Sequence, residues 1–139
     1  VEELGVLDRD DVRRCLQRAQ AGVVLYLPVR SHLEAYPTKM FEYMSAGLPV
    51  IASNFPVWQT VLDGGERGLL VDPRDPAAIS QAMRWTIEHA AEAATMGRRA
   101  REAIETRFNW EREFETLLQF YARLAQDYRL GPAASAGTW

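Results

Sequence analysis

The sequence predicts an α/β protein in which a parallel sheet is flanked by helices and followed by a helical C-terminal extension. Three short apolar runs, at residues 22–28, 48–53 and 68–72, alternate with segments of helical periodicity. Strands that alternate with helices at such short intervals are typical of βα units in a parallel sheet. We interpret residues 1–6 as the remnant of a fourth strand, so the expected sheet is half of a doubly wound one.

The composition is that of an ordinary globular protein and excludes several functional classes. Of 139 residues, 47% are hydrophobic and 25% are charged, which is enough apolar material for one sizeable core. A net charge of -3 gives no electrostatic reason to expect nucleic acid as a partner. No apolar run approaches the roughly 20 residues of a membrane span. We therefore expect a soluble, cytoplasmic protein.

The two ends of the chain and its single cysteine add further expectations. Cys15 has no second cysteine to pair with, so an intrachain disulfide and a cysteine-rich metal site are excluded. The chain begins at Val1, without an initiator Met or a signal-peptide pattern, which predicts a fragment. We expect one domain over residues 1–129, incomplete at its N-terminal side, and a disordered tail over residues 130–139.

The first predicted elements are a helix and a buried strand. Apolar residues recur at helical spacing across residues 9–20, and Asp8 is a suitable N-cap with further acids in the first turn. The run GVVLYLP at 22–28 is rich in β-branched and aromatic residues and ends at Pro28. Such a run indicates a central strand that is buried on both faces.

The next segment contains two carboxylates with seven residues between them. Glu34 lies in a mixed, aperiodic stretch that predicts a loop. Glu42 lies in PTKMFEYMSA, where Pro37 can be the first helical residue and Gly47 can end the helix in a left-handed conformation. Open parallel sheets bind ligands at the carboxyl ends of their strands, where this loop and helix begin. The pair therefore defines a candidate site.

The second half of the chain predicts two more strands and further helices. LPVIAS and GLLVD read as short buried strands, and Pro56 opens a short helix between them. A long helix is predicted over 77–90, the helical pattern continues over 91–108, and a last helix covers 111–128. The helix at 77–90 is expected to present a mainly apolar face made of Ile79, Met83, Trp85, Ile87 and Ala90.

The start of the Glu42 helix offers groups that suit a nucleotide-sugar. The first N–H groups of a helix lack intrahelical partners and attract anions, and Lys39 adds a positive charge for phosphate. The Glu42 carboxylate can accept hydrogen bonds from both vicinal hydroxyls of a ribose, which leaves Glu34 for the sugar. The alternative is a surface pair of Glu42 with Lys39 and a solvated acid at Glu34, since exposed pairs of this kind are common.

Other chemically active residues favour structural interpretations. His32 is interpreted as a polar loop residue, with substrate contact as the less favoured alternative. Trp58 is expected to pack under the short helix. The basic run at 98–101 could meet anionic lipid, but the glutamates that follow it favour a solvated helix face. No metal site is expected.

The sequence segments around and after the two glutamates resemble those of a known family. EAYPTKMFEYMSAGLPVIASNFP, then GLLVDPRDPAAISQAM and FNWEREFETLLQFY, closely resemble the C-terminal domain of retaining glycosyltransferases of family 4. Those enzymes have the GT-B architecture of two Rossmann-like domains. The resemblance extends from about Gly5 to Tyr128 and implies a Rossmann-like nucleotide-sugar-binding domain.

The resemblance implies roles for individual residues. The first Glu of the family's E-x7-E motif contacts the donor sugar and the second binds the ribose, which makes Glu34 a catalytic residue and Glu42 a donor-binding one. Backbone amides after the first Glu hold the sugar and the diphosphate, which points to Ala35, Tyr36, Thr38 and Lys39. Pro37 departs from the glycine of many members; it has no N–H, so one amide contact is lost.

For the whole protein, the resemblance implies an enzyme of class EC 2.4 that transfers a sugar from a nucleotide diphosphate donor to an acceptor. It implies bacterial cell-surface glycan synthesis, no cofactor and no metal. The missing N-terminal Rossmann domain would bind the acceptor, so this fragment is expected to be inactive alone. The intact enzyme could associate peripherally with the inner face of the membrane, and the fragment could self-associate. The alternatives are a non-catalytic partner-binding subunit with the same fold and a nucleotide-sugar epimerase.

Overall fold

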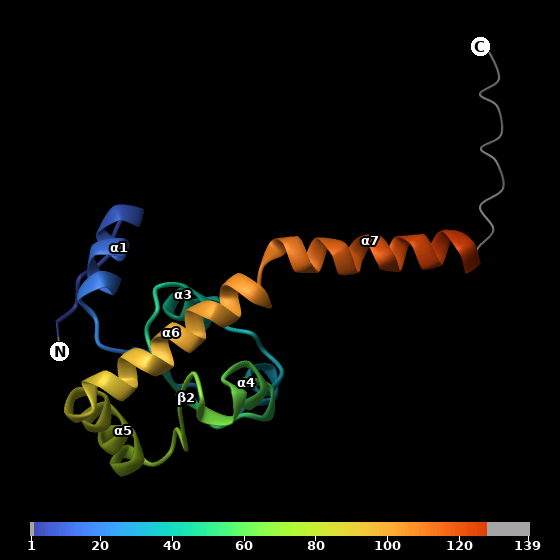
Figure 1. Cartoon of the computed structure of the whole chain (residues 1–139). Helices are drawn as coiled ribbons and strands as arrows, with labels where there is room; N and C mark the ends of the chain where they lie inside the picture. Colours follow the sequence, from blue (N-terminus) through green and yellow to red (C-terminus); the bar gives the residue numbers. More distant parts are fainter. Residues whose placement is uncertain (1, 128–139) are drawn as a thin grey trace. The chain divides into compact units, whose positions relative to one another are not determined.

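The computed structural model describes residues 2–127, which divide into two compact units (Figure 1). The first unit ends at Glu105 and the second begins at Thr106. In chain order the elements are α1 (Arg9–Arg18), β1 (Gly22–Val24), α2 (Arg30–Leu33), α3 (Thr38–Ser45), β2 (Val50–Ser53), α4 (Pro56–Val61), the 3-10 helix η1 (Asp63–Gly65), β3 (Gly68–Val71), α5 (Pro76–Glu88), α6 (Ala90–Thr106) and α7 (Trp110–Asp127). The tail predicted over 130–139 lies outside the described residues.

The sheet has three parallel strands in the order β1-β2-β3, with β2 in the centre. Gly22 pairs with Val50, which pairs with Gly68, and every residue of β2 is buried. The structure therefore confirms the predicted α/β class with a parallel sheet flanked by helices. Residues 2–6 form no strand, so the interpretation of a fourth strand there is wrong for the described residues.

Helices cover both faces of the sheet. Ile51 and Val71 form one apolar cluster with Ala82 of α5, which places α5 on the face to which these strand residues point. The opposite face receives α3, because Tyr43 occupies the space that a Cβ on Gly22 would fill. The core of the first unit therefore lies in two layers, one on each side of the sheet.

Close packing also sets the position of α6, which runs beside α3 (Figure 1). A Cβ on Gly97 of α6 would lie 2.0 Å from the carbonyl oxygen of Gly47, so only glycine allows this approach. Gly47 itself follows α3 with a φ of 74°, which confirms the predicted left-handed residue at the end of that helix.

Several predicted boundaries differ from the structure. The strand predicted over 22–28 pairs with its neighbour only over 22–24. The stretch predicted as a loop contains the one-turn helix α2, and α3 begins one residue later than expected, because Pro37 adopts an extended N-cap conformation. These are differences at element ends, where local and tertiary preferences compete.

The predicted apolar face of the helix at 77–90 is wrong for most of its residues, although Ile79 does pack against the apolar cluster of Ile51, Val71 and Ala82. Ala82 and Thr86 are its buried residues, whereas Ile87 is 61% exposed. The helix also ends at Glu88, and α6 starts after a break at His89. Of the other large residues on the predicted face, Met83 is 39% exposed.

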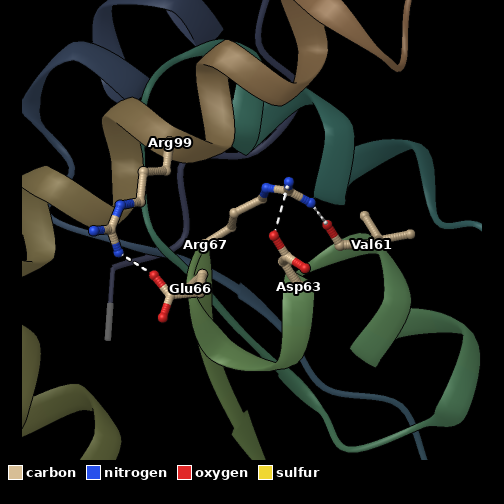
Figure 2. A network of polar contacts seen from close by, with 5 residues as sticks. All are labelled: Val61, Asp63, Glu66, Arg67 and Arg99. Atoms are coloured by element: carbon tan, nitrogen blue, oxygen red, sulfur yellow. Dashed lines mark hydrogen bonds and ion pairs between the residues drawn. The ribbon is translucent and has the colours of Figure 1, made fainter.

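The connection from α4 to β3 is a tight turn that Arg67 stabilises through a hydrogen bond and an ion pair (Figure 2). Asp63, Gly64 and Gly65 all have positive φ. Arg67 donates to the carbonyl oxygen of Val61 over 3.0 Å and forms an ion pair of 3.1 Å with Asp63. Beside it, Arg99 of α6 pairs with Glu66 (Figure 2). This turn leads into the amino end of β3, so it lies away from the carboxyl edge of the sheet.

Candidate functional site

The candidate site begins where β1 and β2 end. Ser53, the last residue of β2, is fully buried, and its Oγ both accepts a hydrogen bond from the Tyr26 N–H and donates one to the Tyr26 carbonyl oxygen, each over 2.9 Å. A side-chain hydroxyl thus takes over the pairing that the strand ladder would have supplied. For this reason β1 leaves the ladder after Val24, and the chain can turn towards α2 and α3.

A cluster of aromatic rings fills the space beyond the strands. The Tyr26 ring lies 5.6 Å from the ring of Trp58 and 4.8 Å from that of His32, centre to centre. Trp58 is fully buried, as predicted, and its Nε1–H donates to the carbonyl oxygen of Ala35 over 2.7 Å. This bond attaches the loop between α2 and α3 to α4. The sequence interpretation missed it, although a buried indole N–H usually requires an acceptor.

His32 is part of this cluster and not a free loop residue. Its Nδ1 lies 2.9 Å from the carbonyl oxygen of Leu27, which can only accept, so Nδ1–H donates this hydrogen bond. His32 therefore holds the end of the β1 segment against α2. This structural role explains its position without the alternative of substrate contact.

The start of α3 carries unpaired donors. Within residues 2–127, the backbone N–H groups of Thr38 and Lys39 have no hydrogen-bond acceptor, whereas the Met40 N–H donates to the carbonyl oxygen of Pro37 over 2.9 Å. Lys39 is exposed, and its Nζ lies 5.4 Å from the centre of the Tyr26 ring. Two amides and one ammonium group are thus available at the carboxyl edge of the sheet for an anion.

Glu42 lies one turn further along α3, exposed, at a groove of about 590 Å³. Within the described chain it forms no ion pair with Lys39, so the surface-pair alternative is not what the structure shows. The groove lies between α1, α3 and α6, and its lining combines apolar, cationic and hydroxyl groups with this one carboxylate. The lining residues are Arg9, Val12, Arg13, Leu16, Gln17, Thr38, Phe41, Glu42, Ser45, Ala46 and Arg101.

The remaining predicted residues have different surroundings. Glu34 is the exposed C-cap residue of α2, and no described residue pairs with its carboxylate. The Ala35 N–H already donates to the carbonyl oxygen of His32 over 3.3 Å, so a ligand would have to compete for it. Tyr36 is 62% exposed. The structure thus brings Thr38 and Glu42 to one groove and places Lys39 over Tyr26, whereas Glu34 stands at the end of another helix.

The described residues contain neither a candidate membrane span nor a candidate metal cluster. Among residues 2–127, no helix combines the length and apolar character needed to cross a membrane. In the same part of the chain, no three His, Cys, Asp or Glu side chains come together as metal ligands would. That the site works without a metal stays a prediction.

The fold is that of an α/β protein of the Rossmann-like class, and the open amides of α3 and Lys39 lie at the carboxyl edge of its parallel sheet. The family model described as "Glycosyl transferases group 1" matches residues 1–103. The chain belongs to this family.

Individual relatives agree with the family assignment. The chain is 38% identical over 101 residues to D-rhamnosyltransferase WbpZ of Pseudomonas aeruginosa, covering 72% of this chain and 26% of that protein. It is 30% identical over 118 residues to glycogen synthase of Mycobacterium tuberculosis, covering 85% and 27%. Sucrose-phosphate synthase from Thermosynechococcus elongatus matches in structure with a TM-score of 0.74 and 31% identity, over 89% of this chain and 30% of that one. The chain thus spans about a quarter of the length of the curated relatives that it matches.

Proposed function

We propose that this chain is the donor-binding part of a retaining glycosyltransferase that uses a nucleotide diphosphate sugar. The observation that carries the proposal is the position of Glu42, a carboxylate free of ion pairs that borders a groove one turn beyond the open amides of Thr38 and Lys39. Family membership supports the class of reaction, since the relatives named above are by name a rhamnosyltransferase, a glycogen synthase and a sucrose-phosphate synthase. The proposal includes the C-terminal placement of this domain and the reading of Glu34 and Glu42 as an E-x7-E motif.

Each part of the nucleotide-sugar donor is bound by a different set of these groups. The Glu42 carboxylate accepts hydrogen bonds from the ribose hydroxyls, and the groove beside it takes the nucleoside. The α3 amides and Lys39 meet the diphosphate, whose negative charge grows as it leaves, so the same groups would stabilise the transition state. Glu34 is the proposed catalytic contact to the sugar, with Ala35 and Tyr36 beside it. No metal or cofactor is required by this set of groups.

The setting of the enzyme is part of the proposal. We place it in the cytoplasm, in bacterial cell-surface glycan synthesis, with peripheral association of the intact enzyme at the inner face of the membrane. Self-association of the isolated chain is supported by the exposed apolar side chains of α7, among them Trp110, Leu118 and Tyr121. The basic run on α6 adds little to a membrane surface, because Arg99 pairs with Glu66 and Arg101 with Glu105.

Nucleotide titration tests the donor site. Isothermal calorimetry with UDP, GDP and ADP should show binding of at least one nucleotide, and Glu42→Ala should weaken it about tenfold or more, because hydrogen bonds to a charged group contribute about 1.5–3 kcal/mol. Glu88→Ala, an exposed acid on α5, is the matched control and should leave affinity unchanged. If all three nucleotides fail to bind, or Glu42→Ala binds as well as the wild type, the assignment is wrong.

A further inference from the structure

We infer that Tyr26 is a positioning residue for Lys39: its ring holds the ammonium group at the carboxyl end of β1, ready for the donor diphosphate. The inference rests on the proposed function for the identity of the ligand. It adds a residue that neither the sequence motifs nor the family match assigns to the site.

The geometry fits a cation–π contact. The Lys39 Nζ lies 5.4 Å from the ring centre of Tyr26, within the roughly 6 Å at which an ammonium group is attracted to the face of an aromatic ring. A lysine held in this way keeps donors for a further acceptor, because its three N–H bonds cannot all point at the ring. The contact therefore orients Lys39 without using up its capacity to bind phosphate.

The Tyr26 ring is itself held in place. Its backbone N–H and carbonyl are both bonded to the buried Ser53 hydroxyl, and its ring packs against Trp58 and His32. His32 is fixed in turn by the Leu27 carbonyl. A ring held by its backbone and by two neighbouring rings is a rigid support, which lowers the entropy that the flexible lysine must lose when it binds a ligand.

The contact also separates two opposite charges. Lys39 and Glu42 are three residues apart on α3, a spacing at which such side chains commonly pair. In the structure Lys39 lies over Tyr26 and not against Glu42. The carboxylate thereby remains open to hydroxyl groups and the ammonium group remains open to phosphate, as one ligand that carries both would require.

A comparison of nucleotide and nucleoside binding tests the inference in the full chain. The probes are the best-bound of UDP, GDP and ADP and its nucleoside. Tyr26→Leu should weaken nucleotide binding by about 2–5-fold, the range of an exposed cation–π contact, and leave nucleoside binding unchanged. Tyr26→Phe keeps the ring and should bind like the wild type. In a Lys39→Met background, Tyr26→Leu should have no further effect.

Nuclear magnetic resonance supplies a readout that needs no ligand. The Lys39 ε-methylene protons should be shifted upfield by the ring, remain so in Tyr26→Phe, and return to the usual position in Tyr26→Leu. If Tyr26→Leu weakens nucleotide and nucleoside equally, leaves both unchanged, or acts equally in the Lys39→Met background, the positioning role is overturned while the donor site stands. If the wild-type chain binds no nucleotide, the proposed function falls, and this inference falls with it.

Discussion

At the scale of single residues, Ser53 joins the fold to the site. Its hydroxyl satisfies both backbone groups of Tyr26, a residue 27 positions away whose ring carries Lys39. A serine at the end of a buried strand looks ordinary in the sequence. Its role depends on which backbone groups lie beside its hydroxyl, and these are determined by the pairing of β1 with β2.

Removal of this hydroxyl should destabilise the protein. Ser53→Ala leaves the N–H and carbonyl of Tyr26 without their partner, which should lower the free energy of unfolding by about 1–3 kcal/mol in urea denaturation. Ser80→Ala, on the exposed side of α5, is the control and should change stability by no more than about 0.5 kcal/mol. Equal stability of the two variants would show that water replaces the Ser53 hydroxyl without cost.

Residues whose roles are local could be predicted from the sequence. The Asp8 side chain accepts from the Asp11 N–H over 2.8 Å at the start of α1, Pro56 is the first residue of α4, and Gly47 is left-handed. Each of these follows from backbone geometry within a few positions. The bond from Trp58 to Ala35 and the ring over Lys39 could not be predicted in this way, because they join separate elements.

At the scale of elements, the α4–β3 turn shows which charged contacts matter (Figure 2). Arg67 is only 16% exposed, and it holds a carbonyl and a carboxylate in a turn that contains three consecutive residues of positive φ. The neighbouring pair of Arg99 and Glu66 is more than half exposed on both sides. Burial and backbone contact, not the number of ion pairs, should therefore decide stability here.

Two substitutions measure separately how much the Arg67 contacts and the Arg99–Glu66 ion pair contribute to stability. Arg67→Ala should lower the free energy of unfolding by about 1–2 kcal/mol, because a shielded guanidinium and a carbonyl bond are lost. Glu66→Ala should cost at most about 1 kcal/mol, since exposed ion pairs contribute little and are screened by salt. Thermal unfolding at low and high salt would measure both. A Glu66→Ala loss equal to that of Arg67→Ala would contradict this ranking.

The types and order of the helices and strands could be predicted from the sequence. The buried face of α5 and the exact ends of several elements could not. Continuous apolar runs correctly indicated three strands, because strands buried on both faces need no alternation. The face of α5 was misjudged because periodicity shows only that a helix is amphipathic. It does not show which residues face the sheet: Ala82 and Thr86 are buried, and Ile87 is exposed.

At the scale of the whole molecule, the site could be predicted in part. The sequence placed Glu42 and Thr38 on one helix start, and the structure places both at the groove. It did not predict that α1 forms the other wall, with Arg9 and Arg13, because nothing in a helical pattern states which neighbour it faces. Under the proposed function these groups bind the donor, and the acceptor site belongs to the part of the longer relatives that this chain does not span.

We therefore expect this chain to bind the donor without catalysing a reaction of it. With a donor that it binds, the chain alone should produce neither transferred nor hydrolysed sugar, because transfer needs an acceptor hydroxyl positioned and deprotonated beside the donor. Chromatography of a radiolabelled donor after long incubation would measure this, with the intact enzyme as the positive control. Transfer or hydrolysis by the chain alone would refute the prediction that this chain binds the donor but does not catalyse.

The same assay distinguishes the alternative functions. An isomerised donor formed without any acceptor would identify an epimerase instead. An intact protein that binds no donor would favour a non-catalytic subunit.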